Sequence, residues 1–340
     1  MARSYRRMTF LPCRRRSGDG IVEGMTTSHT MRAVTQHSLG GPEVLEIAEV
    51  SRPEPRPNEI LVRVRAASLN PTDWKHRAGG GFLGDPPFVL GWDLSGVVAA
   101  VGIGVARFRP GDEVFGMLPY PYGHGAHAEY VAAPARVFAT KPAALDHLHA
   151  AALPLVSLTA WQALVENADL GPGQRVLIHA AAGGVGHVAV QIAKARGAHV
   201  IGTASAPKHD VLRELGVDEA IDYTSQDVAE AVDGVDVVLD TIGGEISTRS
   251  LRTLRPGGIL VSILPVGSED LFREAERRGV RAVRMLVDSS RADLQAITEL
   301  VEQGRLRPMI AETVPLERIA EGHRLGDTGR TTGKIVVTMG

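Results

Sequence analysis

The sequence contains one cysteine, Cys13, in 340 residues, and almost no excess of charge of either sign. One cysteine excludes an intramolecular disulfide and a structural zinc site built on several cysteines, so a reducing cytoplasm is the expected compartment. The sequence has 37 basic and 39 acidic side chains, so the chain carries no excess of positive charge. A nucleic acid or an anionic membrane is therefore not expected as a partner. No apolar run approaches the roughly 20 residues of a membrane-spanning helix. A small neutral molecule is therefore the expected partner.

The N-terminal segment lacks acidic residues and differs from the rest of the chain. Residues 1–18 carry six arginines and no acidic side chain, and the apolar core of a secretory signal is missing. We expect residues 1–30 to be a disordered basic tail or to lie upstream of the true translation start, and a mitochondrial-type presequence is the alternative. Ordered structure is expected to begin near Met31.

The most informative feature that is present is an apolar strand, residues 176–178, followed by a glycine-rich turn and a helix. Apolar residues after the turn recur at the spacing of one helical face. A pyrophosphate at such a helix start meets unpaired backbone N–H groups and the positive end of the helix dipole. Gly183 and Gly184 allow close approach, Gly186 allows tight packing, and Ala181 stands where the pattern's first glycine belongs. The alternative is a Gly/Ala-rich turn before a buried helix.

The surrounding pattern favours the dinucleotide site. Strand-like segments at residues 199–202, 219–222, 235–240 and 258–263 alternate with helical stretches. Repeated strand and helix predict an α/β domain with a parallel, doubly wound sheet of the Rossmann type.

The end of the second strand of this domain indicates which cofactor is bound. An NAD site places an acidic residue there, whereas an NADP site offers cations and hydroxyls to the 2′-phosphate. Here no acidic residue occurs before Asp210, while Ser205 and Lys208 are present and Tyr223 follows the third strand. The sequence therefore predicts NADPH; an ordinary solvated lysine is the alternative for Lys208.

The first part of the chain predicts a second domain. Residues 31–152 are dense in short β-like segments separated by Gly, Pro and Asp, including an alternating run at 59–66. The strand at 334–338 is expected to return to this domain. We expect a substrate domain of residues 31–153 and 291–340, and a nucleotide-binding domain of residues 154–290.

Several motifs follow one another in the order typical of a known family. They are NPTDWK at 70–75, GWDLSG at 91–96, LPLVSLTAW at 153–161, DTIGG at 240–244 and GKIV at 333–336. From Met31 to Gly340 the chain resembles medium-chain dehydrogenases/reductases of the quinone oxidoreductase branch, similar to zeta-crystallin and to plant alkenal/enone reductases. The resemblance implies a GroES-like β-barrel-type substrate domain beside the Rossmann domain, and a homodimer joined through the nucleotide domains.

The resemblance also implies the site residues. Lys75 is expected to reach the cofactor ribose or the substrate oxygen, and Asn70 to lie close to the nicotinamide; a solvated loop lysine is the alternative for Lys75. Asp73 is expected to be structural. The expected cofactor contacts are Thr159, Ala182, Gly183, Gly184, Val185, Gly186, Ser205, Lys208, Tyr223, Ile242, Ile263 and Lys334.

A catalytic zinc is not expected. Zinc-dependent relatives hold the metal with Cys, His and a further ligand, but here Trp92 stands where the histidine would be and Asn70 lies where a cysteine would be supplied. His124 and His127 have a ligand-like spacing but lie among glycines, with no thiolate nearby in the sequence.

Without a metal, hydride addition suits conjugated acceptors, because negative charge moves onto a carbonyl oxygen that the protein can stabilise. We therefore expect an NADPH-dependent reductase of quinones or α,β-unsaturated carbonyls. The alternative is an NADPH-binding protein with a structural or regulatory role. The sequence does not identify the physiological substrate.

Overall fold

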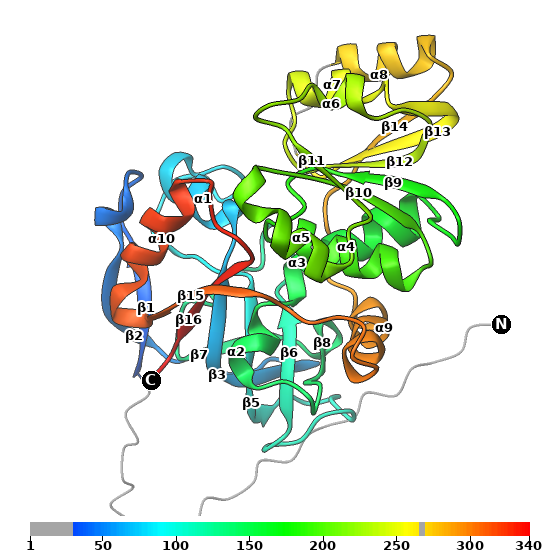
Figure 1. Ribbon diagram of the computed structural model, residues 1–340. Helices are drawn as coiled ribbons and strands as arrows, with labels where there is room; N and C mark the ends of the chain where they lie inside the picture. The colour runs from blue at the N-terminus through cyan, green and yellow to red at the C-terminus, as the bar shows by residue number, and fades with distance from the viewer. Residues whose placement is uncertain (1–29, 265–268) are drawn as a thin grey trace, which may run out of the picture.

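The computed structural model describes residues 30–264 and 269–340, and Figure 1 shows their arrangement. The first strand begins at Thr30, close to the predicted start of ordered structure. The predicted basic tail, apart from Thr30, lies outside the described residues, as does Cys13. No helix in the described ranges is long and apolar enough to cross a membrane.

One lobe is built on a six-stranded sheet in which every neighbouring pair is parallel. The strand order is β11-β10-β9-β12-β13-β14. The first strand of the lobe, β9, lies at the centre, and the chain adds strands first on one side of it and then on the other. This is the doubly wound order of dinucleotide-binding sheets, so the predicted α/β Rossmann fold is confirmed. The strands are β9 (Arg175–Ile178), β10 (His199–Ala204), β11 (Glu219–Asp222), β12 (Val235–Asp240), β13 (Leu254–Ser262) and β14 (Arg281–Arg284).

Helices cover both faces of this sheet in Figure 1. Below lie α3 (Pro154–Trp161), α4 (Gly186–Ala195) and α5 (His209–Leu215), and above lie α6 (Val228–Ala231), α7 (Glu245–Ser250) and α8 (Glu269–Arg277). A π-helical segment, η3 (Gln162–Asn167), continues α3.

Helix α4, which follows the glycine turn, is buried on more sides than its apolar stripe predicts. His187 and Gln191, which lie off that stripe, are buried as well. The backbone N–H of Met309 donates to His187 Nε2 at 3.1 Å, and Gln191 bonds the backbone of Arg307 in both directions at 2.9 Å. These bonds hold the segment that precedes β15 and β16 against helix α4.

The other lobe contains a seven-stranded and a three-stranded sheet. The larger has the order β15-β16-β3-β5-β6-β8, with β7 also paired to β3, and the smaller has the order β2-β1-β4. The strands are β1 (Thr30–Gln36), β2 (Glu46–Ser51), β3 (Glu59–Leu69), β4 (Phe88–Val89), β5 (Asp93–Val101), β6 (Glu113–Met117), β7 (Tyr130–Pro134), β8 (Phe138–Thr140), β15 (Ile310–Pro315) and β16 (Lys334–Thr338).

The long strand β3 organises this lobe. Val62 and Val64 are buried while Arg63 and Arg65 are exposed, the alternation that the sequence predicted. Two register shifts against β5 allow the strand to bend, so that β7 and β16 share its other edge. Pairing of β16 with β3 confirms the predicted return of the C-terminal strand.

The remaining helices are short and lie around the sheets. They are α1 (Pro71–Gly79), α2 (His147–Ala151), α9 (Arg291–Glu302), α10 (Ile319–Asp327), and the 3₁₀ turns η1 (Pro42–Val44), η2 (Ala135–Val137), η4 (Ala206–Lys208) and η5 (Leu316–Arg318). The boundaries predicted between the two domains, after residues 153 and 290, stay a prediction.

Candidate functional site

The glycine-rich turn joins β9 to α4 at the carboxyl edge of the parallel sheet. Its tight bend is made by Ala180, whose φ of 47° lies in the left-handed region, and the N–H of Gly183 donates to Ala180 O at 2.8 Å. A Cβ on Gly186 would lie 2.2 Å from Ala180 O, so only glycine fits there. At Gly184 a Cβ would meet nothing closer than 3.5 Å, so packing alone does not require that glycine. The turn therefore leaves its backbone open where a ligand would approach.

A cavity of about 400 Å³ lies beside this turn. Six of the predicted cofactor residues line it, although they come from four separate segments of the chain: Ala182, Gly183, Ser205, Lys208, Tyr223 and Ile242. Reasoning from the sequence missed other lining residues, among them Thr203, Gln226, Arg249, Gly329 and Thr331.

The polar groups of this cavity suit an anionic ligand. Lys208 Nζ donates to Arg330 O at 2.8 Å, and partial burial lowers the pKa of Lys208. Asp227 is the one acidic side chain among the described lining residues, and it is paired with Arg249. The hydroxyl of Thr331 is buried without a hydrogen-bond partner in the protein, so it has a bond to offer a ligand.

The apolar part of the cavity suits a flat ring. Tyr223 is 57% exposed and Ile242 is 50% exposed, although both line the cavity. The turn that carries Ile242 is shaped by Asp240, whose Oδ1 accepts the N–H groups of Ile242 and Gly243 at 3.0 and 2.9 Å. The cavity thus combines exposed apolar side chains with Ser205 and Lys208, a chemistry compatible with an adenosine 2′-phosphate.

Six of the predicted cofactor residues do not line this cavity: Thr159, Gly184, Val185, Gly186, Ile263 and Lys334. Thr159 is buried and donates to Leu155 O at 2.6 Å, the bond of an ordinary hydroxyl inside a helix. Ile263 follows β13, and its N–H donates to Asp240 O at 3.1 Å. Lys334 lies under the turn with its ammonium directed into the interior rather than toward the cavity.

The two predicted catalytic residues differ in exposure. Asn70 has no exposed surface, so in this structure it positions neighbouring groups and does not face a ligand. Its N–H donates to Asp73 Oδ2 at 2.7 Å, which caps α1 and confirms the structural role expected for Asp73. Lys75 lies on helix α1, so the alternative of a lysine in a loop does not hold. Its side chain is exposed, and its ammonium has no hydrogen-bond or ion-pair partner among the described residues.

Asp73 is held in an unfavourable electrostatic environment. Complete burial raises the pKa of Asp73 to about 7, although the Asn70 N–H and the charge of Lys334 act in the opposite direction. Its Oδ1 is buried without a hydrogen bond of good geometry among the described residues, although the nearby Gly91 N–H also lowers the pKa of Asp73. A buried carboxyl with so few donors retains its proton more easily than a fully bonded carboxylate.

The residues that bear on a metal site are buried or bonded to backbone carbonyls. Trp92 is fully buried and its indole N–H donates to Pro121 O at 3.3 Å. His124 Nδ1 bonds Val89 O at 2.6 Å, whereas His127 is completely buried with a pKa lowered to about 4 by desolvation. In the ranges that the structure describes, no group of three or more His, Cys, Asp or Glu residues is placed to hold a metal.

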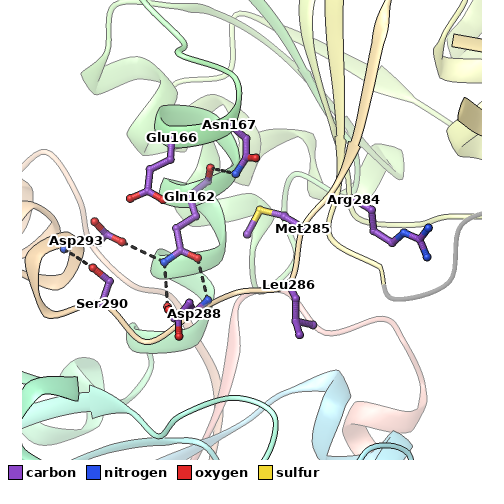
Figure 2. A pocket seen from close by; sticks show the side chains of 9 residues that line it. All are labelled: Gln162, Glu166, Asn167, Arg284, Met285, Leu286, Asp288, Ser290 and Asp293. Carbon is purple, nitrogen blue, oxygen red and sulfur yellow. Dashed lines mark hydrogen bonds between the residues drawn. The ribbon is translucent and has the colours of Figure 1, made fainter. Parts of the chain in front are cut away.

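A second cavity, of about 480 Å³, lies between η3 and the segment that leads from β14 to α9 (Figure 2). Gln162 bonds Asp288 O at 2.9 Å and Asp293 Oδ2 at 3.1 Å, and it accepts the Asp288 N–H at 3.0 Å. None of the predicted site residues lines it. Gln162 therefore holds the connecting segment against the nucleotide-binding lobe.

Comparisons with known proteins cover both lobes. Residues 56–143 match the alcohol dehydrogenase GroES-like domain family, and residues 215–337 match the zinc-binding dehydrogenase family. The mitochondrial NAD(P)H oxidoreductase RTN4IP1 of Mus musculus is 35% identical over 326 residues, which cover 83% of this chain and 82% of the relative.

Two further proteins are similar over most of the chain. The chloroplastic NADPH-dependent alkenal/one oxidoreductase of Arabidopsis thaliana is 34% identical, and the match covers 90% of this chain and 79% of that protein. The solved quinone oxidoreductase of Coxiella burnetii superposes with a TM-score of 0.87 at 36% identity, covering 92% of this chain and 100% of its own.

Proposed function

This chain belongs to the medium-chain dehydrogenase/reductase superfamily, among its quinone oxidoreductases and alkenal/enone reductases, and we propose that it is an NADPH-dependent reductase of quinones or α,β-unsaturated carbonyls. The observation that carries the proposal is the cavity beside the glycine turn, which brings together Ser205, Lys208 and Tyr223 from separate segments. The similar Arabidopsis and Coxiella proteins are named for these activities, which supports the same reaction class.

The proposed preference for NADPH rests on the charges of the cavity. An acid that would bond a ribose 2′-hydroxyl is missing after β10, and Asp227 is already neutralised by Arg249. Lys208 and the hydroxyls of Ser205 and Thr331 are available to the three oxygens of a 2′-phosphate. NADH has no 2′-phosphate to accept from these donors, so it lacks the charge-assisted hydrogen bonds that NADPH would make.

The proposed chemistry is direct hydride transfer to a conjugated acceptor. When bound, NADPH supplies the hydride. The chain then has to orient the acceptor and stabilise the oxygen on which negative charge develops. The exposed ammonium of Lys75 is the proposed donor to that oxygen or to the ribose, while buried Asn70 positions the start of α1.

We propose that the reaction needs no zinc, in spite of the name of the matched family. Trp92 and Asn70 occupy the positions where the motif comparison expects ligands, and both are fully buried in other contacts. A catalytic zinc needs three protein ligands around an open position. Conjugated acceptors do not require the polarisation that a metal gives to an isolated alcohol or ketone.

Assembly and compartment are the last two proposals. We propose a homodimer joined through the nucleotide-binding lobes, because β14 lies at the edge of the parallel sheet, where a second copy can extend the sheet. We propose cytoplasmic residence from the cysteine count, while the similar mouse protein is named as mitochondrial. Light scattering of the purified chain tests the dimer. Imaging of cells that express the full chain with a fluorescent protein fused to its C-terminus tests the compartment.

The reductase proposal is tested by following NADPH absorbance with a panel of quinones and enones. The protein is first dialysed against a strong chelator, and its metal content is measured in parallel. We expect turnover of NADPH with at least one conjugated acceptor, and no formation of NADPH when NADP⁺ is offered with simple alcohols. Saturable NADPH binding without turnover would instead favour the structural or regulatory alternative, and lost activity together with stoichiometric zinc in the untreated protein would reject the zinc-free mechanism.

A further inference from the structure

Lys334, the first residue of β16, is a buried cation at the junction of the two lobes. Its side chain is 2% exposed, and its Nζ donates to Leu69 O at 2.8 Å and to Asn70 Oδ1. The same nitrogen lies 3.8 Å from Asp93 Oδ2. The stem of the side chain runs under the glycine turn, since a Cβ on Gly184 would lie 3.5 Å from Lys334 Cδ.

The carboxylate beside this lysine extends the network in three directions. Asp93 Oδ2 accepts from Ser68 Oγ at 2.8 Å and from Asn70 Nδ2 at 2.9 Å. Asp93 Oδ1 accepts the N–H of Leu155, in the first turn of α3, at 2.7 Å. The network thus joins the end of β3, the residue that caps α1 and the first turn of a nucleotide-lobe helix.

The backbone next to Lys334 is also bonded to the glycine turn. The N–H of Gly333 donates to Ala182 O at 2.9 Å. Gly333 has a positive φ of 77°, and a Cβ added to it would lie 2.4 Å from Met309 O, so only glycine fits there. The position of Lys334 relative to the turn is therefore fixed by main-chain bonds. Its ammonium is fixed relative to α1 by Asn70.

A buried ammonium is costly unless a carboxylate and hydrogen bonds replace water. Burial lowers the pKa of Lys334, and the carboxylates of Asp93 and Asp73 raise it in opposition. The ammonium donates to interior protein oxygens, and Lys334 lines neither cavity described above. The geometry is thus that of an internal brace and not of a phosphate ligand.

We propose that Lys334 is a positioning residue of the reductase, which holds Asn70, and with it the helix that carries Lys75, in a fixed place against the glycine-rich turn. The inference rests on the proposed function, because it assumes that groups on α1 and the cofactor at the turn must meet. It replaces the expectation that Lys334 itself contacts the cofactor. Loss of the brace should misplace the reacting groups without removing a cofactor contact.

The experiment compares Lys334→Met, which keeps the length of the stem, with the double variant Asp93→Asn/Lys334→Met, which removes both buried charges. Lys194→Met, on the outer end of α4, is the matched control. NADPH affinity is measured by fluorescence titration, and kcat is measured with NADPH and with NADPH deuterated at the transferred position. Hydrogen exchange of residues 70–79 is followed by mass spectrometry.

We expect kcat to fall by about 10²-fold in both Lys334 variants, the scale that a misplacement of roughly 1 Å produces. The deuterium isotope effect on kcat should rise, NADPH affinity should stay within about threefold of the parent, and exchange in α1 should become faster. The single variant leaves an unpaired buried carboxylate and can fail to fold; the double variant then carries the test alone.

Two results would overturn the proposal. If the double variant regains the parent kcat, Lys334 only balances the charge of Asp93. If NADPH affinity falls by more than about tenfold while kcat is retained, Lys334 is a cofactor ligand. Should the parent protein reduce no acceptor, the proposed function fails, and exchange of residues 70–79 still decides: faster exchange in the double variant than in Lys194→Met supports the brace, and unchanged exchange rejects it.

Discussion

Among single residues, Lys208 gives the sharpest test of cofactor choice, because its ammonium lines the cavity and is held only by the carbonyl of Arg330. Lys208→Ala should weaken NADPH binding by about 1.5–3 kcal/mol, the scale of a charge-assisted hydrogen bond, and leave NADH binding nearly unchanged. Titration of both cofactors into the parent and the variant measures this difference. Lys208→Arg should retain part of the affinity, and an equal loss for the two cofactors would remove Lys208 from the 2′-phosphate site.

Lys75 tests the proposed stabilisation of the developing oxyanion. Its side chain is exposed on α1 and its ammonium has no partner among the described residues, so its removal should hardly change the free energy of unfolding. Lys75→Ala should lower kcat/KM for an enone by about 10²–10³, as loss of one oxyanion donor does. Weaker NADPH binding would indicate a ribose contact, and a slower chemical step with unchanged affinity would indicate the substrate oxygen. Parent-like kinetics, equal to those of Lys194→Ala, would make Lys75 an ordinary surface lysine.

Asp73 predicts a pH dependence of stability. Its pKa is raised from 3.8 to about 7 in the folded protein, mainly by burial, so the folded state binds a proton more tightly than the unfolded state. The stability that this proton contributes is complete below about pH 4 and is lost as the pH rises through about 7. Asp73→Asn cannot ionise and should therefore gain stability relative to the parent, on the order of 2 kcal/mol between pH 4 and pH 8.

Urea unfolding of both proteins at several pH values measures that difference. The absolute stability of Asp73→Asn is not the readout, because the new amide brings two donors into a buried site. A constant offset between variant and parent across the pH range would show that Asp73 is ionised throughout.

At the scale of elements, two glycines of the glycine turn, Gly184 and Gly186, differ in the space that surrounds them. A Cβ at Gly186 would lie 2.2 Å from Ala180 O, whereas one at Gly184 would make only ordinary contacts from 3.5 Å. Gly186→Ala should cost about 1–3 kcal/mol of unfolding free energy through overpacking. Gly184→Ala should fold with parent stability, because its methyl group would make only ordinary contacts with Lys334, Val156 and Gly333. Equal stability of the two variants would contradict this division.

The strands of the parallel sheet could be predicted from the sequence because apolar runs dominate them. The segments 219–222, 235–240 and 334–338 have the predicted bounds in the structure, since turn residues delimit each of them. Helix α1 was not predicted, because its buried residues are polar: Asp73, His76 and Arg77. No apolar stripe marks such a helix, and its burial depends on partners that are distant in sequence, such as Asp327 for Arg77.

The candidate site was predictable to the extent that its residues follow strands of one sheet. Ser205, Tyr223 and Ile242 each follow such a strand, so the carboxyl edge gathers them. Thr331 and Arg249 carried no local signal, because a loop from the other lobe and a helix bring them to the cavity. For Asn70 the motif predicted a place close to the nicotinamide, whereas the side chain is completely buried and bonded to Asp93 and Lys334. This burial depends on residues distant in the sequence, so the motif could not predict it.

At the scale of the whole molecule, the cavity beside the glycine turn is shared between the lobes. Gly329 and Thr331, which lead into β16 of the seven-stranded sheet, line it together with residues of the nucleotide-binding lobe. A ligand that fills the cavity must therefore contact both lobes, and its binding free energy adds to the stability of their arrangement. Binding to the folded state at about 100 times Kd contributes about 2.7 kcal/mol.

We therefore predict that NADPH raises the midpoint of thermal unfolding more than NADH does at the same concentration, and that Thr331→Val reduces the increment from NADPH. The hydroxyl of Thr331 is buried without a protein partner, so its replacement by a methyl group should leave the free protein as stable as the parent or slightly more stable. The increment falls because the variant lacks one donor to the bound phosphate or ribose. Calorimetric scans of parent and variant, each with no cofactor, with NADPH and with NADH, measure all three effects. Equal increments from the two cofactors in the parent would contradict the 2′-phosphate site, and an unchanged NADPH increment in Thr331→Val would place that hydroxyl outside the contact.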